Sequence, residues 1–208
     1  MASDTDVIET IYYLPGCEWL DDWADNINSQ SGEDGLVMGI FDRLGRPKHR
    51  NEWAMEAGAS DGVTFSNTRQ LLNQGWDVVY VECDDEKFAE LKENTANYPT
   101  AYCFHEVLES LGKNSIDGIL NRTDAPKELD LLSLDIDGGE AWIWDGITEH
   151  EFVVVICEVL HTSSSLKLVH SIALARGYTV VARTQYNVIC VRNECMDALL
   201  NGSPGGAP

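Results

Sequence analysis

The chain of 208 residues is short of positive charge. It has 14 lysines and arginines against 35 aspartates and glutamates, which gives a formal net charge of −21 at pH 7. A field of this sign repels nucleic acids and anionic membranes. We therefore expect a partner that is neither a nucleic acid nor a membrane.

Several other signals are missing. No apolar run approaches the roughly 20 residues that a membrane helix needs. The acidic start "MASDTDVIET" lacks the basic residues and the apolar core of a signal peptide. The six cysteines include no C-x-x-C pair, so neither a zinc site nor a thioredoxin-type site is indicated. We therefore expect a cytoplasmic protein with reduced thiols.

Apolar runs rich in β-branched residues alternate with helical patterns from about Trp53 onward. This alternation predicts an α/β fold: a doubly wound, mostly parallel, Rossmann-like sheet of seven strands with helices on both faces. The last two strands form a hairpin, which predicts an antiparallel strand at the C-terminal edge. The predicted strands are EWAMEAG, DVVYVE, TAYCF, LDLLSLD, FVVVICE, YTVVAR and NVICVR.

Three segments are expected along the chain. Residues 1–50 are predicted to form an N-terminal helix and a connector that pack on the core. Residues 51–200 form the α/β domain, and its length suits a single core. Residues 201–208, "NGSPGGAP", have the composition of a flexible tail.

The ends of the first two strands carry the residue types of a nucleoside site. In a doubly wound sheet, ligands lie beyond the carboxyl ends of the strands. Glu56 ends the first strand and is followed by Gly58 and Gly62, where glycine lets the backbone approach a ligand. Glu82 ends the second strand about twenty residues later, where such folds place the acid that accepts ribose hydroxyls.

The same segment disfavours a dinucleotide. The spacing G-x-G-x-x-G and the P-loop lysine are both missing, and Glu56 and Asp61 would repel a pyrophosphate. A nucleoside that carries a positive charge fits better than NAD or ATP. S-adenosylmethionine is such a ligand, because it has an adenosine, an amino group and a sulfonium.

Acids also end the fourth and fifth strands. The run "LDLLSLDIDGGEAWIW" ends in Asp135, Asp137 and Glu140, and Glu158 ends the next strand, with His161 three residues later. If the two strands are neighbours, Asp135, Asp137 and Glu158 can bind Mg²⁺ through oxygen. Alternatively, Glu158 or His161 is a general base without a metal.

A purely structural alternative remains open for three of these acids. Asp137 and Glu140 can cap the helix that follows, since an acid in the first turn is favoured by the helix dipole. Glu158 can cap the helix that starts near Ser163. Capping would leave these acids without a chemical role.

Three motifs together resemble a known family. "NEWAMEAGASDGVTFSNTRQLLNQGWDVVYVECDDEKFAELKEN", "LDLLSLDIDGGEAWIWDGI" and "VVVICEV" are similar to class I S-adenosylmethionine-dependent methyltransferases, and most of all to the FkbM-like group. The resemblance covers roughly residues 51–191. The chain departs from the group at "DIDGGE", where Asp137 replaces the glutamate of an "IDVEGAE"-like motif.

The resemblance implies a methyltransferase fold and a cofactor site. The implied cofactor-binding residues are Glu56, Gly58, Ser60, Gly62, Glu82, Cys83, Glu106, Val107 and Asp135. It also implies methyl transfer to an oxygen, with a hydroxyl of a sugar or another small molecule as the acceptor. Asp135, Glu158 and His161 are the candidate catalytic residues. The alternative is a non-catalytic binding or structural module in a homo-oligomer or a larger assembly.

Overall fold

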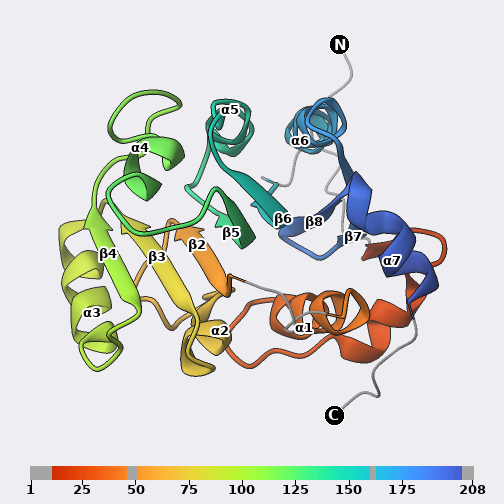
Figure 1. Cartoon of the computed structure of the whole chain (residues 1–208), viewed down its shortest axis with the longest axis horizontal. Coiled ribbons are helices and arrows are strands. Elements are labelled where there is room, and N and C mark those ends of the chain that lie inside the picture. Colours follow the sequence, from red (N-terminus) through yellow and green to blue (C-terminus); the bar gives the residue numbers. More distant parts are fainter. Residues whose placement is uncertain (1–10, 46–50, 160–162, 203–208) are drawn as a thin grey trace.

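One mixed sheet forms the centre of the computed structural model, which describes residues 11–45, 51–159 and 163–202 (Figure 1). Within these residues the sheet has eight strands in the order β1-β7-β8-β6-β5-β2-β3-β4. The strands are β1 Tyr12–Tyr13, β2 Trp53–Ala57, β3 Asp77–Glu82, β4 Ala101–His105, β5 Glu128–Leu134, β6 Glu151–Glu158, β7 Tyr178–Arg183 and β8 Asn187–Arg192. The predicted doubly wound, mostly parallel sheet is thereby confirmed. The sequence predicts seven of the eight strands; β1 is the additional one, and the antiparallel β8 lies between β6 and β7 rather than at the edge.

The strands β2 to β6 are parallel, and β2 lies between β3 and β5. The direction of winding therefore reverses at β2, which is where this type of fold opens a crevice for a ligand. The hairpin β7–β8 forms the C-terminal edge region, with β8 antiparallel to both β6 and β7. The two-residue strand β1 completes this edge, antiparallel to β7.

Helices cover both faces of the sheet. One face packs against α4 (Ile116–Leu120), α5 (Glu140–Asp145) and α6 (Ser163–Ala175). The other face packs against α1 (Glu33–Arg43), α2 (Arg69–Asn73), α3 (Asp85–Thr95) and α7 (Met196–Asn201), and Figure 1 shows α4 to α6 opposite α1 and α2. The short 3-10 helices η1 (Glu18–Trp23) and η2 (Asn193–Cys195) precede α1 and α7.

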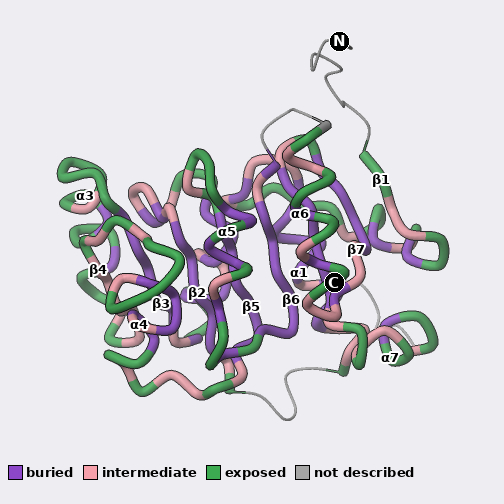
Figure 2. Tube along the Cα trace, turned by 90° about the horizontal axis from the view of Figure 1, so that it is seen from above, coloured by how far each residue is buried: buried purple, intermediate pink, exposed green. Residues whose placement is uncertain are grey.

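Burial on both faces explains the composition of the central strands. In β6, every residue from Phe152 to Cys157 is buried, and β2 is buried along its whole length. Figure 2 shows this buried core following the central strands. A strand covered on both sides needs apolar residues at successive positions rather than in alternation. No helix of the described ranges is long and apolar enough to cross a membrane.

The N-terminal segment joins the same core. The aromatic stretch after Cys17 forms η1, and the longer helix α1 comes later, with Leu36, Ile40 and Phe41 buried against the sheet. Of the predicted tail over residues 201–208, Asn201 ends α7, and residues 203–208 lie outside the described residues.

The carboxyl ends of β2 and β5 come unusually close together. Gly58 follows β2 with a φ of +78°, and a Cβ added there would lie 1.5 Å from the carbonyl oxygen of Asp135. Side chains other than glycine are strained at this φ, and here the added atom would also collide with backbone. Gly58 is therefore needed for the chain to pass over the end of β5.

A pair of glycine substitutions tests this steric requirement. Gly75 has a φ of +92°, but a Cβ added there meets nothing within 4 Å. We expect Gly75→Ala to lower the free energy of unfolding by about 1–2 kcal/mol, from backbone strain alone. Gly58→Ala should cost about 1–3 kcal/mol more, because overpacking adds to the strain. Urea denaturation measures both, and equal losses would contradict the close approach.

Candidate active site

A cavity of about 790 Å³ opens where the parallel strands β2, β3, β4 and β5 end. This is the position that a doubly wound sheet offers to a ligand. Its lining includes Glu56, Gly58, Ser60, Glu82, Cys83, Glu106, Val107 and Asp135, all of which the sequence predicts as cofactor-binding residues. The same wall also contains Asn67, Leu108, Ser133 and Ile136.

Gly62 is the predicted cofactor residue that does not line the cavity. It lies in the turn after β2 with a φ of +71°, and a Cβ added there would lie 2.5 Å from Cδ1 of Leu91 on α3. The structure therefore gives Gly62 a packing role: it lets the turn lie against α3. The G-x-x-x-G spacing did not distinguish a glycine that faces a ligand from one that faces a helix.

The carboxylate of Glu82 is held by backbone N–H groups from two loops. The amide of Ser60 donates to Oε2 at 2.7 Å, and the amides of Cys83 and Asp84 donate to Oε1 at 2.7 and 2.8 Å. Ser60 has a φ of +48°, in the left-handed region. Oε1 thus accepts two hydrogen bonds and Oε2 one, so Oε2 keeps a lone pair that can accept a hydrogen bond from a ligand in the cavity.

Glu56 is more deeply buried, with 4% of its surface exposed. Its carboxylate accepts hydrogen bonds from the hydroxyls of Ser66 and Thr68, both at 2.6 Å, and from the amide of Asn67 at 2.8 Å. Burial raises the pKa of Glu56 to about 7, even though these hydrogen bonds favour the charged form. Glu56 thus fixes the segment 66–68 as the floor of the cavity.

The charge of the cavity wall is strongly unbalanced. Of the described residues, the wall contains seven acids and a single basic residue, Lys87. The acids are Glu56, Asp61, Glu82, Asp84, Glu106, Asp135 and Asp137. Such a wall attracts a cation and repels a phosphate group.

Three of the predicted acids meet beside the cavity. One carboxylate oxygen from each of Asp135, Asp137 and Glu158 lies within 4.8 Å of the others, as the register of β5 and β6 requires. Because like charges this close repel each other, each of the carboxyl groups of Asp135 and Glu158 favours the protonated form of the other. Partial burial, followed by the charges of Asp135 and Glu140, raises the pKa of Glu158 to about 8.

Glu140 does not join this group of three acids. Its side chain is 3% exposed, and Oε1 accepts a hydrogen bond of 2.6 Å from the amide of Gly138. Glu140 therefore closes the turn before α5, and it lies in the first turn of this helix without a capping hydrogen bond to it. Asp137 is exposed with a φ of +59°, and the N-cap position of α5 belongs to Gly139. His161 lies outside the described residues.

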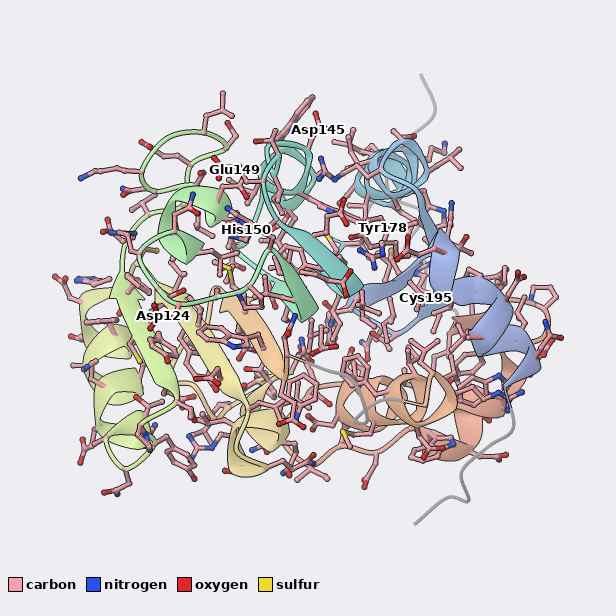
Figure 3. All side chains as sticks on the ribbon, in the orientation of Figure 1. Asp124, Asp145, Glu149, His150, Tyr178 and Cys195 are labelled. Carbon is pink, nitrogen blue, oxygen red and sulfur yellow. The ribbon has the colours of Figure 1, made fainter. Side chains whose placement is uncertain are left out.

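A second, smaller cavity of about 70 Å³ lies at the opposite end of the parallel strands. His150 and Tyr178, which stand just before β6 and at the start of β7, contribute to its wall (Figure 3). Nδ1 of His150 lies 2.7 Å from Asp117, which also accepts from the amides of Thr148 and Glu149. This network connects α4 to the start of β6 and lies far from the carboxyl ends of the strands, where the main cavity opens.

The polar floor of the main cavity was not predicted from the sequence. Asn67 lies between two residues that bond Glu56, and its Nδ2 donates to Oγ of Ser133 at 2.9 Å. Two signals were available: the polar triplet "SNT" directly before a helix, and a serine inside the apolar strand "LDLLSL". The first is typical of a helix start and the second of a buried strand, and neither pattern distinguishes a residue that lines a cavity.

No family model and no curated protein sequence matches this chain. Its structure, however, is similar to several solved structures. Monomeric WbdD matches with a TM-score of 0.56 and 16% identity, over 91% of this chain and 46% of the WbdD chain. The METTL16 MTase domain matches with a TM-score of 0.55 and 15% identity, over 86% of this chain and 78% of that domain.

Precorrin-6y C5,15-methyltransferase from Geobacter metallireducens matches with a TM-score of 0.53 and 11% identity, over 83% of this chain and 96% of that chain. The chain has the Rossmann-like methyltransferase fold. It spans less than half of WbdD and most of the other two. The methyltransferase fold that the sequence implies is confirmed, and the narrower likeness to the FkbM-like group stays a prediction.

The raised pKa of Glu158 has a consequence for stability. Between its ordinary pKa of 4.5 and about 8, the folded protein keeps a proton that the unfolded chain has released. The free energy of unfolding contributed by this group therefore decreases as the pH rises through this window. Glu158→Gln keeps a neutral side chain at every pH, so this part of the decrease should disappear.

Melting curves at pH 5 and pH 9 test the effect. We expect Glu158→Gln to resemble the wild type at pH 5 and to melt at least about 2–4 °C higher at pH 9, the shift that about 1 kcal/mol causes in a chain of this size. Glu93→Gln, on the exposed side of α3, is the matched control and should follow the wild type. A Glu158→Gln variant that loses as much stability between pH 5 and pH 9 as the wild type would contradict the raised pKa of Glu158.

Proposed function

We propose that the chain is an S-adenosylmethionine-dependent methyltransferase that methylates a hydroxyl oxygen of a sugar or another small molecule. The observation that carries the proposal is the carboxylate of Glu82. It is fixed at the carboxyl end of β3 by three backbone amides, inside an acid-lined cavity of a methyltransferase fold. A carboxylate in this place accepts a hydrogen bond from a ribose hydroxyl.

The charge and shape of the wall support this cofactor. S-adenosylmethionine supplies an electrophilic methyl group on a positively charged sulfur. An acid-lined cavity favours that charge, whereas the pyrophosphate of a dinucleotide would be repelled. The side chains of Val81, Val107, Leu108 and Ile136 offer apolar surface for an adenine. Cys83 and Glu106 border this part of the wall.

Asp135 and Glu158 are the proposed proton acceptors. Asp135 lines the cavity and Glu158 lies beside it on the neighbouring strand, so a proton taken from a hydroxyl by Asp135 can pass to Glu158 once Glu158 has ionised. Methylation of a hydroxyl oxygen requires the loss of this proton. The rest of the acceleration is expected from positioning of the two reactants. His161 remains a candidate for the same task.

The acidity of the chain supports a neutral acceptor. With a net charge of −21 and acids around the cavity, a nucleic acid would meet strong repulsion at the site. A sugar hydroxyl meets none, and carboxylates hydrogen bond well to sugars. The same three acids, Asp135, Asp137 and Glu158, are oxygen ligands of the kind that Mg²⁺ takes, so a bound divalent cation is the alternative use of this group.

Calorimetric titration with S-adenosylmethionine and S-adenosylhomocysteine tests the cofactor site. We expect saturable binding to the wild type and a loss of roughly tenfold or more in affinity for Glu82→Ala, because charged hydrogen bonds to the ribose are removed. Glu82→Gln, which keeps the shape, should lose affinity in the same direction. Glu93→Gln should bind like the wild type. A folded wild type that binds neither ligand would contradict the cofactor site and favour the non-catalytic binding or structural module.

Transfer of a labelled methyl group tests the acceptor. We expect incorporation into neutral sugars or glycosides and none into RNA, with a rate that rises as the pH approaches about 8 and Glu158 loses its proton. Glu158→Gln should flatten this pH profile. Transfer to RNA, or an unchanged profile in the variant, would contradict the proposal.

Repetition of the same assay with a chelator and with added Mg²⁺ separates the two uses of the acids. Activity that the chelator leaves unchanged supports the proton-accepting pair. Activity that is lost with the chelator and restored by Mg²⁺ supports the metal, with Asp135, Asp137 and Glu158 as its ligands.

A further inference from the structure

Asn67 occupies a position in the cavity wall that its packing alone does not explain. It lies in the segment between the turn after β2 and helix α2, and only 7% of its surface is exposed. Its backbone amide donates to Glu56 at 2.8 Å, and Nδ2 donates to Oγ of Ser133 at 2.9 Å. Two buried neighbours from β2 and β5 thus fix both the backbone and the side chain.

The remaining atom of this amide has nothing to bind. Oδ1 of Asn67 is buried, and no hydrogen-bond donor reaches it from any residue that the structure describes. A buried carbonyl oxygen without a donor is unfavourable, and native proteins rarely keep one without a reason. Because Asn67 belongs to the cavity wall, a ligand that brings a donor to this place would satisfy it.

The order of the strands indicates which part of the ligand this is. In this part of the sheet the strands follow the order β4-β3-β2-β5. Glu106 and Val107 follow β4, and Glu82 ends β3. Asn67 and Ser133 lie on the side of β2 and β5. If Glu82 holds the ribose, as the proposed function requires, and the base lies toward β4, the substituent on the other side of the ribose extends toward Asn67. In S-adenosylmethionine this substituent is the amino-acid part.

The groups around Asn67 select the ammonium rather than the carboxylate of that part. Glu56 accepts from the backbone amide of Asn67, and Asp135 follows the neighbouring strand. Lys87, the basic residue of the described wall, forms an ion pair with Glu90 on α3. A carboxylate would meet like charges here, whereas an ammonium brings three donors.

We infer that Oδ1 of Asn67 accepts a hydrogen bond from the ammonium group of the cofactor's amino-acid part, and that Ser133 positions the Asn67 side chain for this contact. The inference rests on the proposed function and deepens it. It makes Asn67 a binding residue that distinguishes a complete cofactor from a truncated nucleoside.

A comparison of complete and truncated ligands tests this assignment by calorimetry. 5′-Methylthioadenosine contains the adenosine and the thioether but lacks the amino-acid part. We expect Asn67→Ala to bind S-adenosylmethionine and S-adenosylhomocysteine about tenfold more weakly, the loss expected for one hydrogen bond to a charged group. Its affinity for 5′-methylthioadenosine should equal that of the wild type, which also shows that the variant is folded.

Three further variants make the test specific. Glu82→Ala should weaken all three ligands, since each contains the ribose. Asn67→Asp keeps an acceptor oxygen in the same place and should retain the affinity for S-adenosylmethionine. This variant tests the inference even when Asn67→Ala does not fold. Asn73→Ala, at the exposed end of α2, is the matched control and should change nothing.

Two results would overturn the inference alone. Asn67→Ala could weaken 5′-methylthioadenosine as much as the complete cofactor, which would mean that Asn67 acts through the fold of the wall. It could also leave the affinity for S-adenosylmethionine unchanged. A wild type that binds none of the three ligands would instead overturn the proposed function, and the inference would fall with it.

Discussion

The carboxyl ends of β2 and β5 lie so close together that only a residue without a side chain fits between them. At Gly58 the backbone passes over the carbonyl of Asp135, and the amide of Asp135 donates to Ala57 at 3.0 Å. The amides of Gly58 and Ala59 both donate to Val81 on the other side, also at 3.0 Å. The ends of three neighbouring strands are thereby fixed to one another at the point where the winding of the sheet reverses. Glu82 and Asp135 owe their positions on either side of the cavity to this junction.

The junction concentrates negative charge, and this has opposite effects on stability and on binding. Burial and mutual repulsion raise the pKa of Glu56 to about 7 and that of Glu158 to about 8, so both carboxyl groups cost free energy when they ionise in the folded protein. A cationic ligand in the cavity would offset this cost, because it favours the ionised forms. The acids that weaken the empty site at high pH are thus the groups that would select a sulfonium and an ammonium over a phosphate.

The parts of the site that could be predicted from the sequence are those set by strand ends. Glu82 and Asp135 each end an apolar run, and a parallel sheet brings such ends to one edge whatever the details of packing. The meeting of Glu158 with Asp135 follows from the same rule once β5 and β6 are neighbours. Gly62 and Asn67 could not be assigned in this way. Whether a turn residue faces the cavity or a helix depends on how the turn after β2 packs against α3, which no local pattern encodes. The position of helix α1 within the N-terminal segment could not be assigned for a similar reason, since its apolar face is defined only by the sheet that it covers.

The fold alone does not identify the acceptor, because similarity at 11–16% identity preserves the sheet and not the side chains around the cavity. The distribution of charge around the cavity favours a neutral acceptor over a polyanionic one. A polyanionic acceptor must bring several phosphates to the mouth of the site, and a wall with seven acids and a single described lysine offers no counter-charges for them. A sugar needs only hydrogen-bond acceptors and a base within reach of one hydroxyl, and Asp135 with Glu158 behind it supplies both. These side chains, rather than the similarity of the fold, support the proposed small neutral acceptor.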